Sequence, residues 1–91
     1  MNAQVGMKVK AYKGSCIGIV IQSTTWLGEI VKVNSKSIRV RLTESTSKYG
    51  SKVTGHWENL HTEKTYRFVK TLSDGRAYYR SEGNIYGGIT L

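Results

Sequence analysis

The segment GHWENLH holds the most chemically versatile side chains in this sequence, namely His56, Glu58 and His61. Imidazole and carboxylate groups bind metal ions and transfer protons, so these residue types suggest a metal site or acid–base chemistry. The spacing argues against both. Two histidines five positions apart do not share one face of a helix, and a chain with one cysteine and no further histidine cannot complete a tetrahedral site. We therefore expect surface or hydrogen-bonding histidines, with no metal and no cofactor.

Catalytic motifs are also missing from the sequence. It contains no nucleophile elbow and no phosphate-binding loop, and the absence of proline rules out the pattern of the zinc deaminases. The carboxylates are few and dispersed, which gives little support to a glycosidase-like pair. Cys16 adjoins an apolar run and is expected to be a small buried hydrophobe rather than a nucleophile. The sequence predicts a protein that is not an enzyme.

Positive charge is the strongest compositional signal. Fourteen Lys and Arg residues stand against six Asp and Glu residues, giving a net charge of +8. The excess lies on segments that alternate like strands, whereas residues 43–64 carry equal numbers of acidic and basic side chains. A charge that only serves solubility more often mixes both signs over the surface. This arrangement favours a polyanionic partner.

Several of the basic positions share a strand face with tyrosine. In the run MKVKAY, for example, Lys8, Lys10 and Tyr12 alternate with apolar residues. Lys and Arg neutralise phosphates, and exposed rings stack on unpaired bases, so this combination favours nucleic acid, either RNA or DNA. The alternative is that the tyrosines pack in the core with their hydroxyls at its rim. The predicted nucleic-acid-binding residues are Lys8, Lys10, Lys32, Arg39, Arg41, Arg67, Arg80, Tyr12 and Tyr78.

The elements that must position these side chains are short strands. Period-two alternation predicts strands at 7–12, 16–23, 29–34, 37–44, 66–72 and 77–82, with a closing strand at 89–91. Turn signals separate them at 13–15 (KGS), 34–37 (NSKS) and 73–76 (SDGR), and the last two indicate hairpins. The connection at 43–64 is long enough to hold local structure, either a strand near 52–54 or a helical turn near 56–60.

These elements predict one all-β domain over residues 1–91, with a loose N-terminal tail at 1–6 and an excursion at 43–64. Five to seven short, strongly bent antiparallel strands suit a small barrel, because closure removes exposed strand edges. Trp26 and Trp57 are expected to fill its core. A single cysteine and the lack of a long apolar stretch predict a cytoplasmic protein with no membrane partner.

Residues 6–42 carry a family resemblance in the stretches VGMKVKAY, GIVIQS and GEIVKVNSKSIRVRL. A glycine followed by alternating Val and Ile, a turn, and a strand of alternating apolar and basic residues resembles the SH3-like barrels of Tudor and KOW domains. The resemblance implies an SH3-like fold more than a function, since such barrels host RNA, DNA, methyl-lysine and peptide binders. Residues 43–91 match no family motif.

Two other functions remain open at this stage. The chain could be a protein–protein interaction module that contacts an acidic protein surface. An example would be a phage- or mobile-element-type accessory or inhibitor protein that acts on a larger nucleic-acid-handling complex. Residues 43–64, with Trp57 and Tyr49, would then form the interface, because aromatic anchors are favoured there. A structural subunit of a ribonucleoprotein is the other alternative. The sequence leaves the oligomeric state open.

Overall fold

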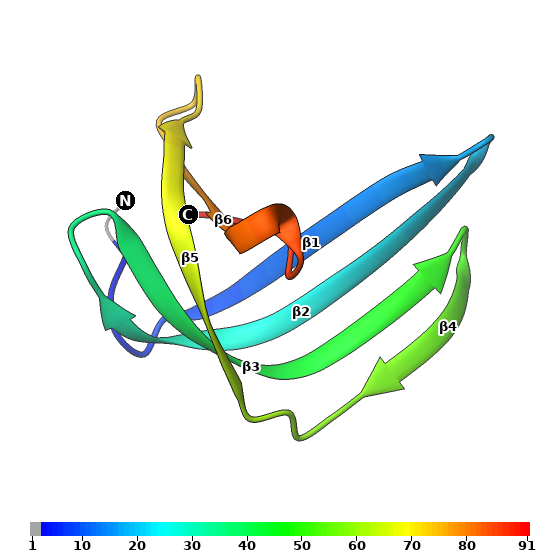
Figure 1. Cartoon of the computed structure of the whole chain (residues 1–91), viewed down its shortest axis with the longest axis horizontal. Coiled ribbons are helices and arrows are strands. Elements are labelled where there is room, and N and C mark those ends of the chain that lie inside the picture. Colours follow the sequence, from blue (N-terminus) through cyan, green and yellow to red (C-terminus); the bar gives the residue numbers. More distant parts are fainter. Residues whose placement is uncertain (1–2) are drawn as a thin grey trace.

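The computed structural model describes residues 3–91, except for the side chain of Ile17. The chain forms seven strands and one short 3-10 turn, η1 (Figure 1). Their bounds are β1 Lys8–Ile17, β2 Val20–Val33, β3 Ser37–Tyr49, β4 Lys52–Trp57, β5 Thr62–Thr71, β6 Ala77–Ser81, η1 Glu82–Asn84 and β7 Gly88–Thr90. No helix in the described part of the chain has the length and apolar character needed to cross a membrane.

Six of the strands close into an antiparallel barrel. The sheet runs β2-β1-β7-β6-β5-β3, and pairing between β2 and β3 joins its two ends. Strand β4 lies outside the barrel and pairs only with β3. The predicted all-β barrel of five to seven bent strands is therefore confirmed, and its architecture is consistent with an SH3-like barrel. Both predicted hairpins are present, β2–β3 around NSKS and β5–β6 around SDGR.

Alternation along β3 sets the inside and outside of the barrel. Ile38, Val40 and Leu42 are fully buried, and the intervening Arg39 and Arg41 are exposed, as expected for a half-buried strand. The remaining buried apolar side chains come from the other barrel strands: Val9, Ala11, Trp26, Ile30, Tyr66 and Ile89. Trp26 lies in the core as predicted, and its ring packs edge-on against Tyr86.

Polar groups at one end of the core are fully paired. The Tyr66 hydroxyl donates to the backbone carbonyl of Tyr86 at 2.9 Å, and burial raises the pKa of this phenol. The Ser81 hydroxyl donates to the carbonyl of Gly87 and accepts from the amide of Tyr86. These bonds attach the segment after η1 to β5 and β6, so the chain returns toward β1 and completes the barrel.

Two hairpins extend beyond the barrel, and Figure 1 shows them side by side. We call this four-stranded part the extension; it comprises residues 13–17, 20–27, 43–49 and 52–57. The predicted turn at 13–15 is wrong, because β1 continues through it to a tight turn at Gly18, whose φ is 64°. Residues 24–28 likewise lie within β2. The excursion at 43–64 consists mostly of the end of β3, β4 and the start of β5, with no helical turn at 56–60.

The N-terminal segment lies against the barrel. Of the predicted tail at 1–6, residues 1–2 lie outside the described residues. The Gly6 amide donates to the carbonyl of Ile30 at 2.8 Å, and Ala3 packs against the core. These contacts place residues 3–6 beside β2.

Candidate nucleic-acid interface

The predicted binding residues lie on the outer surface of the barrel, but they do not form one uniform face. Arg39, Arg41 and Lys32 lie on β3 and β2, with Lys8 nearby on β1. Arg67, Arg80 and Tyr78 lie on β5 and β6. All of them are exposed except Tyr78, which is half-buried. The two groups differ in the acidic side chains that surround them.

Acidic partners offset the charge on β3. Glu63 of β5 accepts from Arg39 Nε at 2.8 Å and from Arg41 Nη2 at 3.3 Å. Arg39 also donates to the hydroxyl of Thr65. On the neighbouring strands, Lys8 pairs with Glu29 at 2.8 Å. The two arginines that the alternation of β3 singles out therefore share one carboxylate, which leaves only part of their charge for a ligand.

Glu63 should make the stability of the barrel pH-dependent. Hydrogen bonds from Arg39 and then Arg41 hold the pKa of the Glu63 carboxyl below its usual range. A depressed carboxyl pKa contributes stability that is present above the unfolded pKa of about 4.3 and lost as the pH falls through the folded value. In the wild type, the urea concentration at the unfolding midpoint should fall as the pH is lowered from about 5 to about 2. We expect this fall to be smaller in Glu63→Gln.

The converse variant provides the control for this pH effect. Arg39→Gln together with Arg41→Gln removes the donors and leaves the carboxyl. This variant should also show a smaller fall of the urea midpoint between about pH 5 and about pH 2. A Glu63→Gln profile parallel to that of the wild type would contradict the assignment. The change should be small, because exposed ion pairs contribute little.

Arg67 and Arg80 have a different environment. They are direct cross-strand partners on β5 and β6, and within residues 3–91 neither forms an ion pair. Lys70, which the sequence did not single out, lies further along β5 opposite Tyr78. We call these four residues the Arg67–Arg80 patch. Like charges directly opposite each other destabilise a sheet, so this arrangement has an energetic cost in the free protein.

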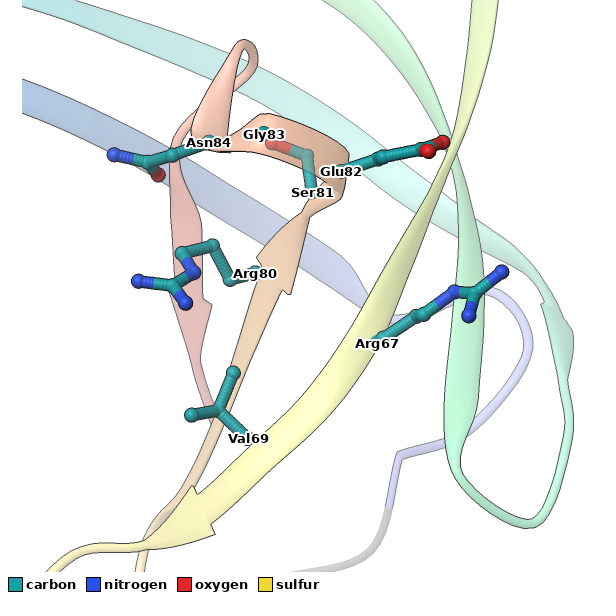
Figure 2. Close-up of a pocket in the computed structure, with 7 residues that line it drawn as sticks. All are labelled: Arg67, Val69, Arg80, Ser81, Glu82, Gly83 and Asn84. Carbon is teal, nitrogen blue, oxygen red and sulfur yellow. The ribbon is translucent and has the colours of Figure 1, made fainter.

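A shallow hollow of about 460 Å³ adjoins the patch (Figure 2). Its lining consists of Arg67, Val69, Arg80, Ser81, Glu82, Gly83 and Asn84. Figure 2 shows Arg80 and Asn84 extending to one side and Arg67 and Glu82 to the other. The two guanidinium groups therefore extend to opposite sides of the hollow, and Glu82 is its one acidic side chain.

Between the patch and β1 lies strand β7, which presents a glycine, Gly88, at this position. Gly88 of β7 pairs with Arg80 on one side and with Tyr12 on the other. The ring of Tyr78 lies over Gly88, and the ring of Tyr12 lies over Gly14. Tyr12 is 53% exposed, so its ring is accessible for stacking. Lys10, two positions away on the same face of β1, adds a further exposed cation.

The residues of the alternative interface lie on the extension. Trp57 was expected in the core, and this expectation is wrong: the side chain is 52% exposed, with its ring over Gly55 of the same strand. Tyr49 is also exposed, at the end of β3. Cys16, expected to be buried, is exposed as well. Among the described side chains of the extension only Trp26 and Ser45 are buried, so these three residues lie where the sheet has no core beside it.

One further cluster lies at the β4 edge of the extension, and only part of it could be predicted from the sequence. His56 and Glu58 are exposed, as predicted, but Glu44 of β3 joins them, while His61 does not. Only the pairing of β3 with β4, which sequence periodicity did not specify, brings Glu44 to this position.

Comparisons of the chain with protein-family models, with curated proteins and with solved structures give no match.

Proposed function

We propose that this barrel binds nucleic acid, RNA or DNA, by contacting the phosphate backbone with the Arg67–Arg80 patch. The observation that carries the proposal is the direct cross-strand pairing of Arg67 with Arg80, neither of which has an acidic partner in the described chain. Such a pair costs stability in the free protein, and a bound phosphate would offset that cost.

The chemistry of the side chains fits a phosphate ligand. A guanidinium group presents a planar fork of donors that matches two phosphate oxygens, and it stays charged at all physiological pH values. Lys70 and Lys10 would add point charges along the backbone, while the exposed Tyr12 ring would stack on an unpaired base. Contacts of this kind position a nucleic acid without reading its sequence.

The remaining predicted residues would contribute less. Lys8, Arg39 and Arg41 would have to share their charge with Glu29 and Glu63, whereas Lys32 has no such partner within residues 3–91. The resemblance of residues 6–42 to KOW and Tudor barrels supports the same general function, since nucleic-acid binders occur among such domains.

A salt series tests the proposal. The protein, treated with nuclease and repurified, is titrated into labelled single-stranded and duplex oligonucleotides of RNA and DNA. Four phosphate contacts, from Lys10, Arg67, Lys70 and Arg80, predict a slope of log K against log salt of about −2.8 for single strands and about −3.6 for duplex DNA. Binding that is undetectable at low salt, or that does not weaken as salt rises, would overturn the proposal.

A second candidate function has one specific observation in its favour. Among the described side chains of the extension and of the turn between β1 and β2, six large apolar ones are exposed, and the edge of β4 is open. These side chains are Ile19, Ile21, Leu27, Tyr49, Val53 and Trp57. We propose as the alternative that this part contacts a protein of a larger nucleic-acid-handling complex. Recovery of a stoichiometric protein partner after nuclease treatment, lost in Trp57→Ser, would favour this alternative over direct nucleic-acid binding.

A further inference from the structure

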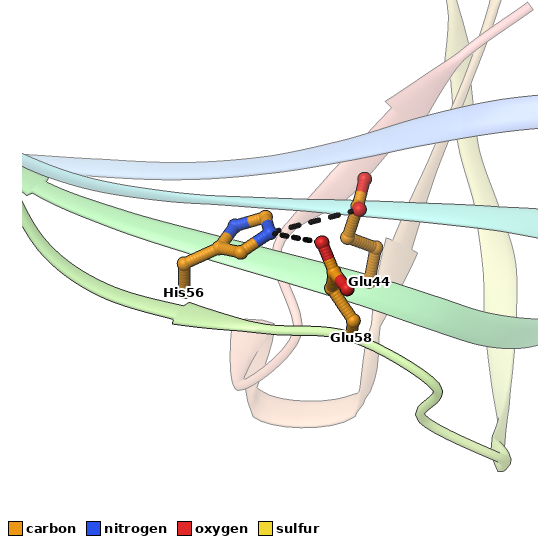
Figure 3. A group of neighbouring side chains, drawn as sticks. All are labelled: Glu44, His56 and Glu58. Atoms are coloured by element: carbon orange, nitrogen blue, oxygen red, sulfur yellow. Dashed lines mark hydrogen bonds and ion pairs between the residues drawn. The ribbon is translucent and has the colours of Figure 1, made fainter.

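Three potential metal ligands converge on the outer face of the extension (Figure 3). The His56 Nε2 atom lies 3.2 Å from a carboxylate oxygen of Glu58 and 3.7 Å from one of Glu44. The three ligand atoms all lie within 4.8 Å of one another. This cluster is separate from the Arg67–Arg80 patch, which lies on β5 and β6.

The strand register explains why these side chains meet. His56 and Glu58 are two positions apart, so they project from the same face of an extended chain. Thr46 of β3 is the direct partner of His56, and Glu44 is two positions before Thr46 on that face. The objection from helical spacing does not apply, because β4 is a strand and Glu44 supplies the ligand that GHWENLH lacks.

A fourth residue fixes the direction of the imidazole ring. The hydroxyl of Thr46 lies 2.8 Å from His56 Nδ1. This bond occupies Nδ1 and leaves Nε2 as the nitrogen that faces both carboxylates, as Figure 3 shows. A hydrogen bond at the second ring nitrogen is the usual way in which proteins orient a metal-binding histidine.

The charge at this point favours a cation. Two carboxylates lie close together, and no Lys or Arg of residues 3–91 forms an ion pair with either of them. Two basic side chains, Lys10 and Lys48, line an adjacent hollow together with Glu44. His61 lines another hollow together with Glu44 and Glu58.

The two separations from the imidazole fit a tetrahedral ion. With ligand bonds of about 2.0 to 2.2 Å, neighbouring ligands of a tetrahedral Zn²⁺ ion lie about 3.3 to 3.6 Å apart. The two distances from His56 Nε2, 3.2 and 3.7 Å, span that range. One imidazole and two carboxylates, without sulfur, favour a divalent transition metal over Mg²⁺ or Ca²⁺, which prefer all-oxygen ligands.

We propose that Glu44, His56 and Glu58 bind one divalent transition-metal ion such as Zn²⁺. Each residue supplies one ligand atom, and water completes the coordination. Thr46 acts as a positioning residue through His56 Nδ1. The site uses none of the residues of the Arg67–Arg80 patch, so the variants that test it leave that patch unchanged.

Calorimetric titration of the full chain with Zn²⁺ alone tests this site. The protein is first dialysed against a chelator and carries Cys16→Ser, which removes the exposed thiol as a competing ligand. We expect one ion per chain, a loss of binding of at least about 100-fold in His56→Ala and in Glu44→Gln, and a loss of about 10- to 100-fold in Thr46→Val. Asp74→Asn, which removes an exposed carboxylate in the β5–β6 turn, should bind as the parent does.

The alternative is a hydrogen-bonded histidine that binds no metal, and the same experiment distinguishes it. Absence of Zn²⁺ uptake at neutral pH would overturn the proposal, as would uptake that His56→Ala and Glu44→Gln leave unchanged. Circular dichroism establishes that the variants fold. Because the altered side chains are exposed or half-buried, we expect unchanged spectra. A histidine NMR signal that shifts on Zn²⁺ addition, and is missing from His56→Ala, would support the site without a binding constant.

Discussion

Arg67→Glu combined with Arg80→Glu is expected to weaken nucleic-acid binding by at least about 100-fold at low salt. Each lost charge-assisted contact to a phosphate is worth about tenfold in affinity, and each introduced carboxylate adds repulsion. The barrel should remain folded, because the variant keeps a like-charged pair at the same cross-strand position. Fluorescence anisotropy with labelled oligonucleotides measures the affinity.

A matched variant separates the patch from the net charge. Lys48→Glu with Lys52→Glu, on the extension, lowers the net charge from +8 to +4, as the patch variant does. We expect it to retain most of the affinity, with only the loss that follows from a weaker overall field. Equal loss of binding in both variants would contradict a localised site and assign the effect to net charge.

The single change Arg80→Glu gives a signature that a purely structural role would not produce. A carboxylate opposite Arg67 makes a favourable cross-strand pair, so the free energy of unfolding should rise by about 0.2 to 1 kcal/mol while affinity falls. A residue retained for stability should lose stability when it is replaced. A gain in stability together with a loss of binding would indicate that Arg80 is kept for a ligand.

The sequence predicted the barrel where one face of a strand is buried. Ile38, Val40 and Leu42 alternate with arginines because β3 has a core on one side and water on the other. On the extension both faces of the sheet are largely solvated, so Ser, Thr and Lys occupy either parity and the alternation disappears. The KGS segment therefore resembled a turn, although residues 13–15 continue β1.

The candidate sites were less predictable, because they depend on register between distant strands. Parity correctly indicated that Arg39, Arg41, Arg67 and Arg80 face outward, but it carries no information about their neighbours. The neutralising contact of Glu63 with Arg39 spans 24 positions in the chain. The pairing of Arg67 with Arg80 follows from the β5–β6 hairpin. Counting paired residues outward from the Asp-Gly turn would predict this pairing only if the strands were regular. A bulge near Val69 shifts the register by one residue, so the count fails.

Gly87→Ala is expected to destabilise the barrel by about 2 to 5 kcal/mol. Gly87 has a φ of 72°, a left-handed conformation that costs an alanine about 1 to 2 kcal/mol. A Cβ atom there would also collide with the backbone of Tyr12 and Lys13, where β7 closes against β1. Overpacking of a fixed backbone adds about 1 to 3 kcal/mol. Urea denaturation, monitored by tryptophan fluorescence, measures the loss.

Gly75→Ala is the matched control for this closure. Gly75, in the β5–β6 turn, has a φ of 88°, but a Cβ atom there would meet no neighbour within 4 Å. It shares the conformational cost and lacks the collision, so the difference between the two variants isolates the contact between β7 and β1. Equal losses would mean that β7 can move away from β1 at no cost. A larger loss in Gly87→Ala, with faster hydrogen exchange in β7, would identify this contact as the one that closes the barrel and holds Arg80 beside Gly88.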